Sequence, residues 1–534
     1  MNATFRSLGA VPLVLSVQAF AAACSPKPAT SAAPIASAPD TPVPAPATPP
    51  PIPMSDEAIA PVVAPFPVPA FVRPSFPART FDVQAFGAVG DGHTKNSAAF
   101  ARAIEAASQA GGGTVLVPEG RWLTGPIHLR SNVRLHVVKG AELLFSQDFA
   151  DYLPPVFTRW EGLEVYNYSA LIYARDCENV AVTGEGTLNG QGQAWWPWKK
   201  TQQATAARLY ELATSGVPPE QRVLAVEGGL RPSFIQTVGC RNVLVEGVTI
   251  RNGPMWTIHP IYSENVIVRR VQVRTEGPNN DGCNPDSSKN VLIEDSFFST
   301  GDDCVVIKSG LNEDGWRVGK PSENIIVRRI HGELGHGGVV IGSEMSGSVR
   351  NVWVSDSEFI GTDRGLRIKS MRGRGGVVEN VYYENVRHKD IAMMVVEMTT
   401  AYASSTLVPK TDKPPLFRNV FVRNLSASGA KSAAEISGLA DVAIENLVFE
   451  HVQITSETGF HCTECQGLRL DDTHVTPSAG APFVLVNTRQ ATLTGSCGPK
   501  ATECVTLKGD RSAEVRSDGA AVAVEAQAKP AKKK

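Results

Sequence analysis

The chain contains 534 residues, of which 51 are Lys or Arg and 53 are Asp or Glu, so its formal net charge is −2. Hydrophobic residues make up 42% of the chain, which is enough to bury a large core. The near-zero net charge gives no general attraction to nucleic acid or to an anionic membrane, and a polyanionic partner would need a local basic patch. We therefore expect no nucleic-acid partner.

The first 24 residues have the pattern of an export signal. Arg6 precedes an apolar stretch, residues 8–23, that contains a proline and is short for a membrane span. Three alanines then precede Cys24, which resembles a bacterial lipoprotein signal whose cysteine becomes the lipidated first residue. We expect an exported outer-membrane or periplasmic lipoprotein that meets the membrane only through this anchor. Cleavage within the alanines, which would give a soluble secreted protein, is the alternative.

Two segments are predicted to lie outside any folded domain. Residues 25–78 hold 17 of the 38 prolines in the chain, all between Pro26 and Pro77, and are predicted to form a solvated linker. Residues 512–534 end in KPAKKK and are predicted to form a disordered basic tail. The folded domain is therefore expected over residues 79–511.

A short helix is predicted near the start of this domain. Five apolar residues between Ala99 and Ala107 fall on one helical face, and the glycines at 111–113 end the helix. We expect this helix to cap the exposed end of the core.

A repeat follows the helix. Asn precedes a run of apolar/polar alternation at nine positions: Asn132, Asn179, Asn242, Asn265, Asn290, Asn324, Asn351, Asn380 and Asn419, with a weaker copy at Asp441. The Asn-to-Asn spacings from Asn242 are 23, 25, 34, 27, 29 and 39 residues. This period, with β-type runs and no long helices between them, predicts an all-β fold, a single-stranded right-handed parallel β-helix.

In a β-helix, equivalent positions of neighbouring coils lie side by side. Four segments share one pattern: 280–288, 301–309, 335–343 and 362–370. Aligning them places Asp281, Asp302, His336 and Asp363 at one level, pairs Cys283 with Cys304, and puts Trp256 level with Asp281. Alternation along the strand then turns Arg367 and Lys369 outward. It also turns Asp303 inward, so we expect a bend at residues 301–303, because a buried unpaired carboxylate is costly.

The aligned set predicts chemistry at a glycosidic bond. Three close carboxylates repel, so at least one of them keeps its proton near neutral pH. A protonated acid beside ionised ones can protonate a leaving oxygen while another activates water. The nearby Arg, Lys and His suit an anionic sugar. A solvated charged face, with Asp favoured at turns, is the alternative.

At these residues the sequence resembles glycoside hydrolase family 28, the polygalacturonases and their relatives. The family motifs Asn-Thr-Asp, Gly-Asp-Asp, Gly-His-Gly and Arg-Ile-Lys read here as residues 279–281, 301–303, 335–337 and 367–369, with Asn280 in place of Thr. The resemblance covers residues 80–500 and implies inverting hydrolysis of α-1,4-galacturonosidic bonds in pectin or polygalacturonate, without metal or other cofactor.

The resemblance also implies residue roles. Asp302 resembles the general acid, Asp281 and Asp303 the pair that holds and deprotonates water, and His336 a support for the acid. Arg367 and Lys369 resemble ligands of the galacturonate carboxylate in subsite +1. Asn279 and Trp256 are further candidate substrate-binding residues. Tyr402 is a candidate subsite tyrosine, although an ordinary loop tyrosine would look the same.

Two features of the sequence favour an exo-acting mode. Residues 282–286 resemble those of bacterial exo-acting members. Segments 146–172 and 193–232 interrupt the repeat on the N-terminal side, where the family places the minus subsites, and could wall off that side. A monomer acting on a pectic polysaccharide or oligogalacturonide is expected.

Two other classes of protein stay open. A pectate lyase would also be a parallel β-helix but would need a calcium-binding acid cluster and an arginine base. A non-catalytic glycan-binding β-helix would need none of the acids. The eight cysteines after Cys24 allow disulfides in an exported chain, and Cys462/Cys465 and Cys497/Cys504 are the local pairs.

Overall fold

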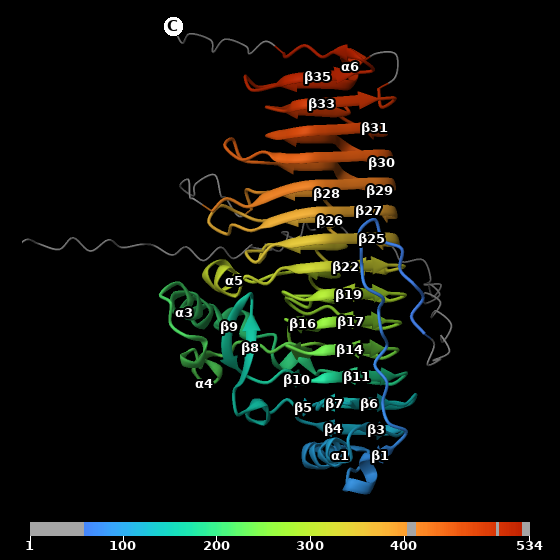
Figure 1. The fold of residues 1–534 in the computed structure, drawn as a ribbon, viewed down its shortest axis with the longest axis vertical. Helices are drawn as coiled ribbons and strands as arrows, with labels where there is room; N and C mark the ends of the chain where they lie inside the picture. The colour runs from blue at the N-terminus through green and yellow to red at the C-terminus, as the bar shows by residue number, and fades with distance from the viewer. Residues whose placement is uncertain (1–57, 403–412, 498–500, 526–534) are drawn as a thin grey trace, which may run out of the picture. The chain divides into compact units, whose positions relative to one another are not determined.

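The computed structural model describes residues 58–402, 413–497 and 501–525. The predicted signal, the lipidation candidate Cys24, and most of the predicted linker lie outside these residues. Within them, no helix is long and apolar enough to cross a membrane. The described chain forms a right-handed parallel β-helix, which confirms the predicted fold class (Figure 1).

Three columns of parallel strands run along the β-helix, and each strand pairs with strands of the neighbouring coils. The first column follows the repeated asparagines and contains β1 (Thr80–Asp82), β3 (Gly113–Val117), β6 (Val133–Val137), β11 (Glu178–Gly184), β14 (Arg241–Glu246), β17 (Glu264–Arg269), β19 (Lys289–Glu294), β22 (Ser322–Arg328), β25 (Val349–Ile360), β27 (Val377–Lys389), β29 (Leu416–Ser437), β30 (Ile444–Thr463), β31 (Cys465–Pro477), β33 (Arg489–Thr494) and β35 (Ala513–Ser517).

The second and third columns complete each coil, and the long strands β25, β27, β29 and β30 turn corners and contribute to more than one column. The second contains β2 (Asp91–Lys95), β4 (Gly120–Thr124), β7 (Ala141–Phe145), β12 (Thr187–Asn189), β15 (Thr249–Arg251), β18 (Gln272–Thr275), β20 (Phe297–Thr300) and β23 (His331–Leu334). The third contains β5 (Ile127–His128), β10 (Ile172–Arg175), β13 (Ile235–Val238), β16 (Ile258–Ile261), β21 (Val305–Ile307), β24 (Val339–Gly342), β26 (Arg364–Lys369), β28 (Met394–Thr399), β32 (Phe483–Val486) and β34 (Val505–Lys508).

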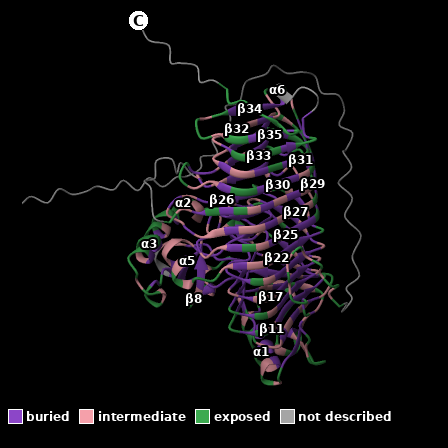
Figure 2. Ribbon diagram, turned by 45° about the horizontal axis from the view of Figure 1, so that its top comes forward, coloured by how far each residue is buried: buried purple, intermediate pink, exposed green. Residues whose placement is uncertain are grey.

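The core is a stack of β-branched side chains inside the coils. Val266, Val291, Ile325 and Val352 pair in register along the first column, and each is at most 1% exposed. Such stacking buries each side chain against its equivalents one coil away. Figure 2 shows buried residues, alternating with more exposed ones, in strands along the whole stack of coils.

Helix α1 (Ser97–Gln109) covers the N-terminal end of this core, as predicted (Figure 1). Its buried residues are Ala99, Phe100, Ala103, Ile104 and Ala107, the face expected from the sequence. The other helices and 3-10 turns are short: α2 (Trp198–Thr201), α3 (Gln203–Thr214), α4 (Ala225–Gly228), α5 (Asn312–Val318), α6 (Ala501–Cys504), η1 (Val83–Phe86), η2 (Phe149–Tyr152), η3 (Gly192–Ala194) and η4 (Pro219–Gln221).

The repeated asparagines form a hydrogen-bonded ladder. Asn351 Nδ2 donates to Asn324 Oδ1 at 3.0 Å, and Asn380 Nδ2 donates to Asn351 Oδ1 at 3.1 Å. Each of these three residues has a φ of 57°, a left-handed conformation that Asn tolerates better than most residues. The weaker repeat was misplaced at Asp441: the ladder continues through Asn446, which donates to Asn419 at 2.8 Å.

The predicted linker ends earlier than residue 78. Residues 59–77, which we name the N-terminal strap, lie along the outer face of the first column (Figure 1). Phe71 packs against outward apolar side chains that include Leu244 and Ile267. The amide of Val72 donates to Asn265 Oδ1 at 3.2 Å, and Arg73 pairs with Glu246. The strap folds because it covers an apolar stripe that would otherwise face water.

The predicted tail also begins later than residue 512. Strand β35 pairs in parallel with β33, and Val515 pairs with Ala491. A short strand, β36 (Ala520–Ala521), then returns antiparallel to β35. The β-helix therefore includes one more coil, because Val515 continues the inward apolar position of the column.

The two predicted excursions from the repeat form a lateral insertion beside the third column (Figure 1). The first is an antiparallel hairpin of β8 (Val156–Trp160) and β9 (Leu163–Asn167), and the second contains α2, α3 and α4. They share an apolar core of their own, in which Trp160, Leu209 and Trp256 are buried. This core joins the insertion to the coil that precedes the acid cluster.

Two disulfides lie in the C-terminal coils, Cys462–Cys465 and Cys497–Cys504. The four other cysteines of the described residues are free and buried: Cys177, Cys240, Cys283 and Cys304.

The ladder predicts a measurable loss of stability in Asn351→Ala. The change removes two hydrogen bonds, worth about 1 kcal/mol each, and puts an alanine in a left-handed conformation at about 1–2 kcal/mol. We expect the free energy of unfolding, measured by chemical denaturation, to fall by about 3 kcal/mol. Asn351→Gly is the matched control, since it loses the bonds but avoids the strain, and should lose less. Equal losses in both variants would contradict the strain argument.

Candidate active site

The predicted acids converge at the start of the third-column strands, but the register differs from the expected one. Cys283 pairs with Val305 and Asp286 pairs with Lys308, one residue later than the sequence alignment implied. The amide of Gly282 donates to the carbonyl of Asp303 at 3.0 Å. Asp281 therefore lies level with Asp303 rather than with Asp302, and the expected pairing of Cys283 with Cys304 was wrong. The sequence alignment had matched Asp-Gly-Cys to Asp-Asp-Cys by residue type. The irregular backbone at this place shifts the actual pairing by one residue.

The chain bends at Gly301 and Asp302, as expected, and this bend lets both acids of the pair face the site. Asp303 is 1% exposed and accepts a hydrogen bond from Lys369 Nζ at 3.0 Å, so its buried charge is compensated. Its other oxygen, Oδ1, has no hydrogen-bond partner among the described residues. That oxygen therefore keeps its acceptor positions unused within the described structure.

Asp281 is also buried, and Asn284 Nδ2 donates to its Oδ2 at 2.6 Å. Burial, together with the negative charge of Asp302, raises the pKa of Asp281 well above its ordinary value. The expectation that one acid of the cluster keeps its proton thus applies to Asp281. Asn284 was missed by sequence reasoning, although it lies only three residues further along the chain.

Asp302 and His336 form a close pair. His336 Nδ1 lies 3.2 Å from Asp302 Oδ1, and the backbone amide of His336 donates to the carbonyl of Asp302 at 3.1 Å. Burial alone would raise the pKa of Asp302, but the hydrogen bond and charge of His336 outweigh it and lower that pKa below its ordinary value. The same hydrogen bond raises the pKa of His336. The pair therefore stores a proton on the imidazole, where half of the side chain is exposed.

Arg367, Lys369 and Tyr402 lie together, as the resemblance implied. The Arg367 guanidinium is 5.6 Å and the Lys369 ammonium 5.8 Å from the centre of the Tyr402 ring. Arg367 Nε is also 2.5 Å from Glu397 Oε2, an acid that sequence reasoning missed. Both cations of this group therefore already have a carboxylate partner.

Trp256 differs from the expectation that it binds substrate. Only 4% of it is exposed, because the lateral insertion covers it, and its ring packs edge-on against His259 at 4.8 Å. Lys308 Nζ lies 4.5 Å from the centre of the indole and pairs with Glu344 at 2.8 Å. Lys308 was missed, although the sequence carried its signal: it follows Ile307 as Lys369 follows Ile368.

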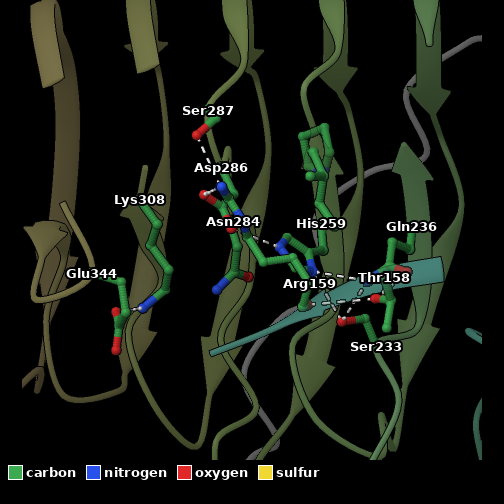
Figure 3. A network of polar contacts seen from close by, with 12 residues as sticks. Thr158, Arg159, Ser233, Gln236, His259, Asn284, Asp286, Ser287, Lys308 and Glu344 are labelled. Carbon is green, nitrogen blue, oxygen red and sulfur yellow. Dashed lines mark hydrogen bonds and ion pairs between the residues drawn. The ribbon is translucent and has the colours of Figure 1, made fainter. Parts of the chain in front are cut away.

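A buried polar network ties the hairpin to the coil that carries Asp281 (Figure 3). Arg159 of β8 donates to Asp286 Oδ1 at 2.6 Å and to Ser287 Oγ at 2.9 Å. His259 Nε2 lies 3.5 Å from Asp286 Oδ2. At its other end the hairpin is held by Asp314, which accepts from the amide of Glu164 and pairs with Arg222. The hairpin is therefore a fixed wall beside the site.

Asn279 joins the acids to two cations from the lateral insertion. Its Oδ1 accepts from Lys199 Nζ and from Arg231 Nη2, each at 2.6 Å, and its Nδ2 donates to Asp302 Oδ2 at 3.4 Å. Sequence reasoning missed both cations because they lie in a segment without the repeat, which offers no alignment.

Within the described ranges, no group of three or more His, Cys, Asp or Glu side chains is arranged to hold a metal ion.

The chain is similar to family models and to proteins of known name. Residues 223–477 match the family model "Glycosyl hydrolases family 28", and residues 80–136 match "Rhamnogalacturonase A/epimerase, pectate lyase-like". A Vitis vinifera protein named "Probable polygalacturonase" is 30% identical over 72% of this chain and 77% of its own length. An exo-poly-alpha-D-galacturonosidase of Dickeya chrysanthemi is 28% identical over 71% of this chain and 67% of its own.

A solved structure is also similar. The exopolygalacturonase of Thermotoga maritima superposes with a TM-score of 0.70 at 46% identity, over 72% of this chain and 88% of that protein. The aligned acids, the β-helix that carries them and these similarities together place the chain in a family: it belongs to glycosyl hydrolase family 28.

Proposed function

We propose that this protein hydrolyses α-1,4-galacturonosidic bonds of polygalacturonate or oligogalacturonides, with inversion, and that it acts from the chain end. The observation that carries the proposal is the cluster of Asp281, Asp302 and Asp303, with His336 on one acid and Lys369 on another. It contains both a stored proton and a charge-compensated carboxylate, which are what single displacement by water needs. The named polygalacturonases among its relatives support the substrate class.

In the proposed reaction, Asp302 gives a proton to the glycosidic oxygen as the bond from the anomeric carbon to that oxygen breaks. That proton is the one stored on His336, which passes it to Asp302 during the transfer, so a single proton moves from the imidazole through the carboxyl group to the leaving oxygen. Water attacks the anomeric carbon from the opposite face and releases a proton to Asp303, whose Oδ1 is free to accept it. Protonated Asp281 orients the water, with Asn284 holding its carboxyl in place. One bond breaks and one forms, so the configuration inverts.

The lateral insertion supports action from a chain end. The β8–β9 hairpin is fixed by Arg159 and by Asp314 beside the coil of Asp281. A substrate cannot extend through a fixed wall, so cleavage would be limited to the end that reaches it. The 46% identical exopolygalacturonase agrees with this mode.

The products test the proposed function. On polygalacturonate, we expect one short product of constant size from the first minutes, detected by anion-exchange chromatography. The viscosity of the solution should fall little for each reducing end released, because long chains persist. An early mixed ladder of oligomers, with a rapid fall in viscosity, would show internal cleavage and reject the end-acting mode.

The assignment of the acid can be tested with an activated substrate. Asp302→Asn should lower turnover of trigalacturonate about 10²–10⁴-fold, the usual contribution of a general acid. It should retain most activity on a nitrophenyl α-galacturonide, because that leaving group needs no proton. Asp303→Asn should lose both activities, since the base is needed with either substrate. A nitrophenyl activity that survives in Asp303→Asn but not in Asp302→Asn would reverse the two roles.

The pH profile tests the stored proton. Asp302 and His336 share one proton, and their contact raises the pKa of His336 above 6.5. Beside a neutral side chain, Asp302 would hold that proton less tightly. The value of kcat/KM should therefore fall as pH rises through that pKa, and His336→Asn should move this alkaline limb to lower pH. His336→Gln is a second neutral control and should behave in the same way. An alkaline limb that stays in place in both variants would contradict this role.

A further inference from the structure

Two cations of the lateral insertion meet at one neutral oxygen. Lys199 Nζ and Arg231 Nη2 are both 2.6 Å from Asn279 Oδ1. The remaining donors of Arg231 also reach neutral acceptors: Nε donates to Gln202 Oε1, and Nη1 donates to the carbonyls of Pro254 and Pro278. Arg231 is 0% exposed. The protein thus holds a buried guanidinium in a fixed orientation without a carboxylate against it.

The other cations of the site are arranged differently. Lys369 pairs with Asp303, Arg367 with Glu397, and Lys308 with Glu344. Among the described residues, no carboxylate forms an ion pair with Lys199 or with Arg231. The charges of Glu161, Asp281 and Asp302 act on Arg231 only through space, and burial raises the pKa of Glu161, which weakens its compensation of the two cations. Buried charges in proteins are ordinarily paired, so two cations without an ion-pair partner favour an anionic ligand. Burial lowers the pKa of Arg231 to about 10, at which it is still charged at neutral pH.

The position of this pair defines which anion it would meet. Asn279 Nδ2 is 3.4 Å from Asp302 Oδ2, so one amide separates the cations from the acid of the proposed reaction. Arg367 and Lys369 lie on strand β26, on the C-terminal side of that acid. Lys199 and Arg231 come from the insertion on the N-terminal side, so the two cationic groups flank the acids along the axis of the β-helix.

We propose that Lys199 binds the carboxylate of the sugar at the non-reducing side of the scissile bond. In this proposal Arg231 is a positioning residue, which orients Asn279 and adds a positive electrostatic potential at the carboxylate. This inference rests on the proposed function and deepens it. The enzyme would then bind an acidic sugar on both sides of the bond. It would accept uniform polygalacturonate and reject polymers with a neutral sugar on the non-reducing side of the scissile bond. Lys199 is only half-buried, so its ammonium can turn from the Asn279 oxygen to the ligand.

The test compares trigalacturonate with the same trimer methyl-esterified on the sugar directly on the non-reducing side of the bond that the wild-type enzyme cleaves. The wild-type enzyme should prefer the free acid by about 10- to 100-fold in kcat/KM, the size of a charge-assisted hydrogen bond. Lys199→Met should lose this preference, mainly through a higher KM for the free acid. Lys199→Arg should restore part of it. The matched control is Lys200→Met, an exposed neighbour on the same helix, which should keep the wild-type preference.

The outcomes separate this inference from the proposed function. A wild type that hydrolyses neither trimer would reject the proposed function. A wild type that hydrolyses both, with a preference for the free acid that Lys199→Met retains, would reject only the role of Lys199. Binding of galacturonate to each variant by calorimetry gives a readout independent of turnover: Lys199→Met should bind it about 10- to 100-fold more weakly, and equal affinities would overturn the inference. Thermal unfolding of each variant identifies any loss that comes from misfolding.

Discussion

Hydrogen bonding between parallel strands of successive coils is the constraint on which the whole protein depends. Neighbouring strands lie about 4.8 Å apart, so residues separated by 20 to 40 positions in the chain become side-by-side neighbours. The Asp302–His336 contact joins two such segments, and the Lys369–Asp303 contact reaches one coil further. Each acid of the site therefore depends on the register of its coil. The asparagine ladder and the stacked β-branched core hold that register over the length of the β-helix.

Compensation of charge organises the site on this scaffold. Three carboxylates lie together in a poorly solvated place, and each has a different environment: burial and Asp302 raise the pKa of Asp281, Asp302 contacts His336, and Asp303 contacts Lys369. Most nearby cations are similarly paired with acids. The exception is the Lys199–Arg231 pair, which faces an amide. In the proposed binding of an acidic sugar, this pair adds positive charge on the side of the acids opposite to Arg367 and Lys369.

The sequence predicted the fold and most of the site because both follow from a repeat. Once the coils were aligned, Asp302, His336 and Lys369 had to be close, and their contacts confirm that proximity. The alignment failed by one residue at Asp281, where an irregular bend changes the pairing, and no pattern of letters reports such a bend. Lys199 and Arg231 could not be found, because the insertion has no internal period. The N-terminal strap could have been: Leu244, Ile267 and Leu292 are apolar at outward positions, which indicates a covering segment.

This strap changes how the coils share their stability. In a simple solenoid each coil contacts only its neighbours, so cooperativity decays along the axis. The strap, however, contacts Tyr382 of β27 through Phe66 and Arg134 of β6 through Phe76, and it crosses the coils between them. Opening any of these coils requires releasing apolar contacts that belong to several others. The strap therefore links distant coils directly, and the coils between its two contacts share apolar partners that a simple solenoid would not give them.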